Sequence, residues 1–89
     1  MDNIVFKALA EPKRRQILRM LRQQPMTTPE ISAHFTLAGS TLAKHLGVLK
    51  RAALIQANRK GNRVLYNINL VEVEKALAAV TNLLGKEQQ

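Results

Sequence analysis

The chain has 89 residues, a size typical of one small domain whose hydrophobic core is marginal unless a partner subunit extends it. Its 14 Lys and Arg residues outnumber 6 Asp and Glu residues, and the net charge of +8 favours a polyanionic partner. The lack of cysteine excludes disulfides, thiolate metal sites and cysteine nucleophiles, and no export signal or membrane-spanning stretch is evident, so we expect a cytoplasmic protein without membrane insertion.

Two helices are predicted first along the chain. Apolar residues at helical spacing predict a short helix within the first ten residues. Pro12 then starts a second, amphipathic helix that ends before Pro25. Arg14 lies on the apolar stripe of this helix, so we expect its guanidinium to be half buried and paired, with Glu11 or Glu30 as candidate partners.

A helix-turn-helix is predicted next. Thr27 and Glu30 have the spacing of a capping box, so a third helix should begin there and run to about Phe35. A fourth helix follows after a short segment, and two helices joined so tightly are typical of a helix-turn-helix. Its apolar stripe consists of Leu42, Leu46, Leu49 and Ala53. Small and cationic side chains should therefore face outward from this helix.

A basic hairpin and a last helix complete the predicted order. Alternating apolar residues on either side of Gly61 and Asn62 predict two antiparallel strands, with the turn at these two residues because both tolerate positive φ. Asn69 is a candidate cap for a helix that Gly85 ends. We therefore expect one domain, residues 1–89, with a mainly α fold and a two-stranded β-wing: a winged helix-turn-helix, which implies nucleic-acid binding.

Three segments resemble the ArsR family of bacterial repressors. They are residues 6–18 (FKALAEPKRRQIL), 42–50 (LAKHLGVLK) and 59–68 (RKGNRVLYNI). The similarity extends over nearly the whole chain and is greatest to a branch of short autorepressors within the family. The resemblance implies a homodimer that binds double-stranded DNA and represses transcription at a promoter, and twofold symmetry predicts an inverted-repeat operator.

The resemblance implies DNA contacts in the fourth helix at Ser40, Thr41, Ala43 and Lys44, and the helical wheel independently exposes the same four positions. The further candidates are His45, at the edge of the apolar stripe, and Arg59, Lys60, Asn62 and Arg63 in the wing. The helix is expected in the major groove, and the wing along the phosphates or in the minor groove; a solvated surface is the alternative for both. His45 is expected to bond a phosphate or a neighbouring carbonyl. Because the four outward positions from Ser40 to Lys44 include no Asn, Gln or Arg, specificity should depend on Lys44, methyl contacts and DNA shape.

The terminal helices, about residues 2–10 and 70–84, are expected to form the dimer interface. The residues predicted there are Ile4, Val5, Leu70, Val73, Leu77, Val80 and Leu84. Those of the last helix repeat every 3.5 residues on average, the period of a helix–helix seam. Packing of this stripe within its own subunit is the alternative.

Three departures from the family pattern bear on mechanism. Metal-sensing relatives use cysteines or His and acidic ligands, whereas the last helix here offers only Glu72 and Glu74 on different faces, so we expect no metal and no cofactor. The fourth helix lacks the usual cap hydroxyl, and Ser40 is the substitute expected. Ala53 stands where relatives often have a helix-ending Gly, so a positive φ there would cost about 1 kcal/mol and another turn geometry is the alternative.

One competing function comes from a different class. A winged-helix module whose basic face binds an acidic protein is the alternative to a DNA-binding regulator. An enzyme is disfavoured because no Ser-His-Asp set, paired-carboxylate motif, Gly-rich phosphate loop or metal cluster is evident. The sequence leaves open whether a regulatory partner protein or the expression level controls the protein.

Overall fold

Five helices and three short strands make up the part of the chain that the computed structural model describes, residues 3–83 and 85. The helices are α1 (Asn3–Ala10), α2 (Pro12–Gln23), α3 (Thr28–Ser32), α4 (Gly39–Arg51) and α5 (Leu70–Leu83). The strands are β1 (Met26–Thr27), β2 (Ile55–Lys60) and β3 (Arg63–Ile68). This order confirms the predicted mainly α fold with a β-wing and adds one strand to it.

The additional strand is β1, which joins the hairpin in a three-stranded antiparallel sheet of order β1-β3-β2. Met26 pairs with Tyr66 and Thr27 with Leu65. A strand of two residues is too short to show an alternating pattern in the sequence. Its formation depends on pairing with β3, which lies far along the chain. Its effect is to attach the start of α3 to the wing.

Local signals account for the helix boundaries of α2 and α3. Glu11 caps α2 by accepting a 3.0 Å hydrogen bond from the backbone N–H of Lys13, and Pro12 occupies the first helical position. The predicted capping box of Thr27 and Glu30 is present at α3. α3 ends at Ser32, before the predicted Phe35, because the N–H groups of His34 and Phe35 bond three residues back in a tightened turn.

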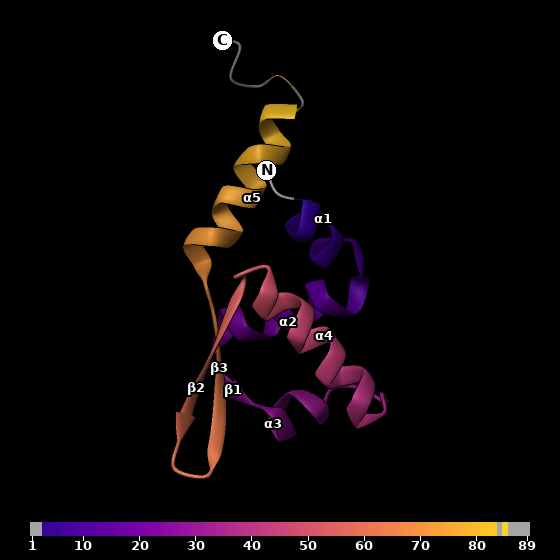
Figure 1. Ribbon diagram of the computed structural model, residues 1–89, viewed down its shortest axis with the longest axis vertical. Helices are drawn as coiled ribbons and strands as arrows, with labels where there is room; N and C mark the ends of the chain where they lie inside the picture. The colour runs from indigo at the N-terminus through magenta and orange to yellow at the C-terminus, as the bar shows by residue number, and fades with distance from the viewer. Residues whose placement is uncertain (1–2, 84, 86–89) are drawn as a thin grey trace.

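The core lies between α1–α4 and the sheet. Its buried members are Ala8, Ile17, Leu18, Leu21, Met26, Ile31, Leu42, Leu46, Leu49, Ala52, Leu54 and Ile55. α5 leaves this core and extends to one end of an elongated molecule of 49 × 24 × 20 Å. The wing tip and the N-terminal end of α4 lie toward the other end, at the bottom of Figure 1.

Candidate nucleic-acid interface

The outward face of α4 carries the predicted helix contacts. Leu42, Leu46 and Leu49 are buried and fix the rotation of the helix. Ser40, Thr41, Ala43 and Lys44 are all exposed. The structure thus brings four of the five predicted helix positions to one free surface, where small side chains allow close approach and Lys44 supplies a cation.

The start of α4 differs from the prediction that Ser40 caps it. The helix begins at Gly39, and Ala38 occupies the N-cap position with φ −62° and ψ 149° and without a side-chain hydrogen bond. The Ala38 carbonyl accepts from Thr41 and Leu42. The extended backbone of Ala38 begins the helix two residues earlier than a Ser40 cap requires, so the Ser40 hydroxyl lies within the first turn.

His45, the fifth predicted helix contact, is half buried and faces α2. Its Nδ1 lies 3.2 Å from Nη1 of Arg14. A guanidinium only donates, so the neutral imidazole accepts at Nδ1 and carries its proton on Nε2. Burial and the positive charge of Arg14 lower the pKa of His45. The expected phosphate or carbonyl partner is therefore not what Nδ1 binds, and a DNA contact through Nε2 stays a prediction.

Arg14 is half buried as predicted, but the predicted carboxylate pairing is wrong. Its Nε donates to the Ala8 carbonyl at 2.8 Å, and its Nη2 donates to the Lys7 carbonyl at 2.9 Å. The carbonyls at the end of α1 lack partners inside that helix, and they lie where a side chain pointing back from α2 reaches them. The short connection between α1 and α2 brings Arg14 back to these carbonyls, and the amino-acid composition does not reveal this contact.

The four residues predicted to contact DNA from the wing lie at and beside its turn. Lys60 pairs with Arg63 across the turn, and Arg59, Lys60, Asn62 and Arg63 are all exposed. Gly61 has φ 64°, whereas Asn62 is not among the positive-φ residues, so the turn lies where predicted but only its first central residue needs glycine. Three cations gather at the tip of one hairpin.

A hollow of about 410 Å³ lies between the wing and the start of α3. It is lined by Thr27, Thr28, Pro29, Glu30, Asn62, Arg63 and Val64. Two hydrogen bonds from Thr27 lower the pKa of Glu30, and the Arg63 charge lowers it further. The exposed Thr28, which lines this hollow together with Arg63, was missed from sequence. The capping box locates the start of α3, but the pairing of β1 with β3 is what brings it to the wing.

An apolar surface on α5 is the second feature of note. The large hydrophobic side chains that are exposed in the described residues all belong to this helix: Leu70, Val71, Leu77, Val80 and Leu83. Ala76 is the one fully buried residue in the described part of α5. Of the other predicted dimer residues, Ile4, Val5 and Val73 are half buried against the core, and Leu84 lies outside the described residues.

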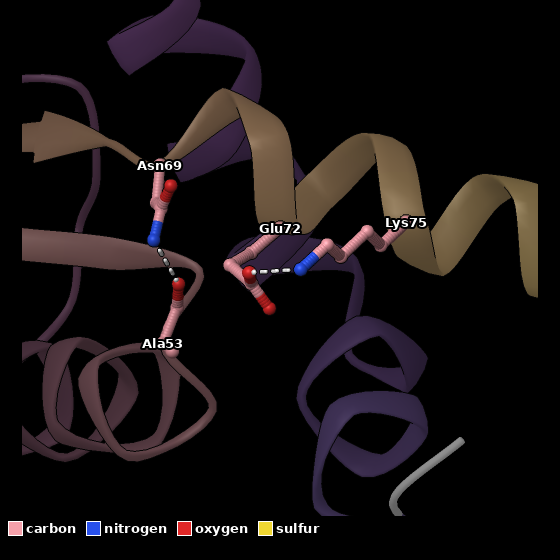
Figure 2. A network of polar contacts seen from close by, with 4 residues as sticks. All are labelled: Ala53, Asn69, Glu72 and Lys75. Carbon is pink, nitrogen blue, oxygen red and sulfur yellow. Dashed lines mark hydrogen bonds and ion pairs between the residues drawn. The ribbon is translucent and has the colours of Figure 1, made fainter.

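The beginning of α5 is attached to the end of α4. The side-chain amide of Asn69 donates to the Ala53 carbonyl, and Lys75 pairs with Glu72 one turn along the helix (Figure 2).

Within residues 3–83 and 85, no three His, Cys, Asp or Glu side chains gather as metal ligands. No helix in these same residues is long and apolar enough to cross a bilayer.

A helix-turn-helix with an exposed second helix, followed by a basic hairpin near the same end, defines a winged-helix DNA-binding protein. Residues 11–57 match the family described as "Bacterial regulatory protein, arsR family". The chain belongs to this family. It is therefore a DNA-binding transcription regulator, and the prediction that it is not an enzyme is confirmed by the family.

Similar proteins extend the likeness over almost the full chain. The transcriptional repressor SdpR of Bacillus subtilis is 34% identical over 84 residues, which are 94% of this chain and 93% of SdpR. The crystal structure of Mycobacterium tuberculosis Rv0081 is similar with a TM-score of 0.73 and 33% identity, covering 94% of this chain and 85% of that one. HlyU from Vibrio cholerae is similar with a TM-score of 0.74 and 30% identity, covering 90% and 87%.

Proposed function

We propose that the protein is a cytoplasmic repressor that binds an inverted-repeat operator as a homodimer. The observation that carries this proposal is that the α4 contacts and the basic wing tip are both exposed and that the start of α4 and the wing tip lie toward the same end of the molecule (Figure 1). The name of SdpR as a transcriptional repressor supports the direction of control. HlyU is named a transcriptional activator, so the direction needs its own measurement.

In the proposed complex, α4 lies in the major groove. Lys44 contacts a base edge or a phosphate, and the small side chains of Ser40, Thr41 and Ala43 let the helix approach the bases. The Nε2–H of His45 points to a phosphate. Arg59, Lys60, Asn62 and Arg63 hold the flanking sugar-phosphate backbone or the minor groove. Charge supplies affinity, and the two copies of α4 set the register.

The homodimer covers the exposed apolar face of α5. Leu77 is 59% exposed and Val80 is 40% exposed, although they lie on the same stripe as the half-buried Val73. Such a row on a helix that projects from a small core is stabilised when a second copy buries it. The predicted interface residues Ile4 and Val5 lie on α1, and Leu70 begins the α5 stripe. Twofold symmetry then separates the two α4 helices by about one DNA turn, roughly 34 Å.

DNase I footprinting on the DNA upstream of the protein's own gene tests the proposal. We expect protection of an inverted repeat whose half-sites are about one helical turn apart. A reporter driven by that promoter should show lower expression when the protein is present. Protection of no promoter DNA together with stable capture of an acidic protein would select the interaction module instead, and raised expression would contradict repression.

A further inference from the structure

The last four carbonyls of α1 are all bound by two neighbouring arginines of α2. Arg14 binds the carbonyls of Lys7 and Ala8, as described above. Nη1 of Arg15 donates to the Leu9 carbonyl at 2.8 Å and to the Ala10 carbonyl at 3.1 Å. These are the four carbonyls that an eight-residue helix leaves without internal partners. Arg14 and Arg15 therefore each bind two of these four carbonyls.

The two arginines differ in one contact. Nη1 of Arg14 also reaches His45 of α4, 31 residues further along the chain, whereas the hydrogen bonds of Arg15 go to the end of α1. Arg14 is half buried and Arg15 is exposed. Arg14 thus links three elements: it belongs to α2, binds the carbonyls at the end of α1 and contacts His45 on the side of α4 that faces α2.

We infer that Arg14 is a positioning residue for DNA recognition: through Nδ1 of His45 it holds α4 at a defined angle to α1. The inference rests on the proposed function, in which α1 belongs to the dimer interface and α4 enters the major groove. Two copies of α4 fit successive grooves only if each is fixed relative to the interface that joins them. The fully buried Ala8 packs at the same junction, so the link lies at the contact of α1 with the core.

The contact requires a neutral imidazole. An imidazolium has no acceptor for Arg14, and it repels the guanidinium. Around His45, Arg14, Lys13 and Lys44 oppose protonation, and Glu11 favours it. Burial and the cations outweigh Glu11, so the pKa of His45 is lowered and the link is formed at neutral pH.

The matched pair R14M and R15M separates positioning from helix capping. Each variant removes one cation and two bonds to α1 carbonyls, but only R14M removes the contact with α4. We expect R14M to weaken binding to a labelled duplex carrying the footprinted segment about tenfold more than R15M does, the factor that one charge-assisted hydrogen bond carries. Circular dichroism should show the wild-type helix content in both variants. Equal losses in the two variants would overturn the inference.

Substitutions at His45 test whether Arg14 acts through it. Asparagine places an acceptor near the position of Nδ1, so H45N should bind the duplex better than H45L. In the H45L background R14M should cost little further affinity, whereas the cost of R15M should be unchanged. An R14M cost that is the same with and without His45 would contradict the inference.

A readout without DNA keeps this inference distinct from the proposed function. In ¹⁵N NMR spectra at pH 7.5, His45 should be the Nε2–H tautomer in the wild type and in R15M, and a mixture of tautomers in R14M. Residual dipolar couplings should show a changed angle between α1 and α4 in R14M alone. If the wild type binds no duplex, the proposed function fails; if tautomer and angle are the same in all three proteins, the positioning role fails.

Discussion

The side-chain amide of Asn69 donates a 3.0 Å hydrogen bond to the carbonyl oxygen of Ala53 and so joins the start of α5 to the turn after α4 (Figure 2). Ala53 has φ 62°, a left-handed conformation that alanine seldom adopts. Its N–H bonds the Lys50 carbonyl at 2.9 Å, and the N–H of Leu54 bonds the Leu49 carbonyl at 3.0 Å. These bonds form a Schellman motif, so Ala53 adopts the positive φ and the turn does not take the alternative geometry that the sequence left open.

The first prediction is that A53G stabilises the protein by about 1 kcal/mol, since glycine adopts this φ without steric cost. Urea denaturation at fixed protein concentration measures the change. A52G is the control, because Ala52 has φ −82° and 5% exposure and should lose about 1 kcal/mol or more through backbone entropy and a lost methyl group. Destabilisation by A53G would show that the alanine methyl makes a contact that outweighs the strain.

The second prediction concerns acid. The lowered pKa of His45 means that the unfolded chain binds its proton first, so stability is complete above pH about 6.5 and decreases as the pH falls below that value. The pKa values of Glu11 and Glu30 are lowered mainly by backbone hydrogen bonds from Lys13 and Thr27, so their contribution is present above about 4.5 and is lost as the pH falls through the lowered values.

Urea midpoints between pH 8 and pH 3 should therefore decline in two steps. H45N should remove the upper step, and E30Q should reduce the lower one. A variant without His45 that retains the upper step would contradict the assignment. E30Q keeps a side-chain oxygen that accepts from the Thr27 N–H, so it removes the titrating charge while the capping box is retained.

The third prediction is that L77E converts the dimer into a folded monomer. Leu77 is 59% exposed in the protomer, so glutamate costs little in the monomer but places two charges in the proposed interface. Sedimentation velocity measures the mass, and circular dichroism measures helix content. V71E is the control: Val71 is 60% exposed but lies outside the predicted stripe, and its variant should remain dimeric. A wild type that is monomeric at micromolar concentration would exclude the proposed homodimer.

Patterns that are local in sequence were predictable, and contacts between distant elements were not. The capping box at Thr27 and the turn at Gly61 depend on residues within four positions of each other, and both are present. β1 exists only through pairing with β3, and the acceptors of Arg14 are set by the folding of α2 back onto α1. The exposed face of α4 followed from its leucine spacing, whereas the inward hydrogen bond of His45 required the position of Arg14.

The fourth prediction is that metal ions do not control the protein. Zinc binding requires about four nitrogen, sulfur or oxygen ligands, the chain has no cysteine, and Glu72 on α5 is already paired with Lys75. We expect operator affinity to be the same with 10-fold excess zinc and with EDTA, as measured by fluorescence anisotropy. Stoichiometric zinc binding that releases the duplex would contradict this prediction.

The most direct test of the central claim, that α4 and the wing bind DNA together, is the salt dependence of operator affinity in the wild type, K44A and R63A. With about 8 phosphate contacts per dimer, log affinity should fall with log salt at a slope near −7, and loss of a phosphate-contacting cation from both subunits should make the slope about 2 units shallower. K75A removes one exposed cation on α5 and should keep the wild-type slope. Binding that is insensitive to salt, or K44A and R63A slopes equal to that of K75A, would contradict the account.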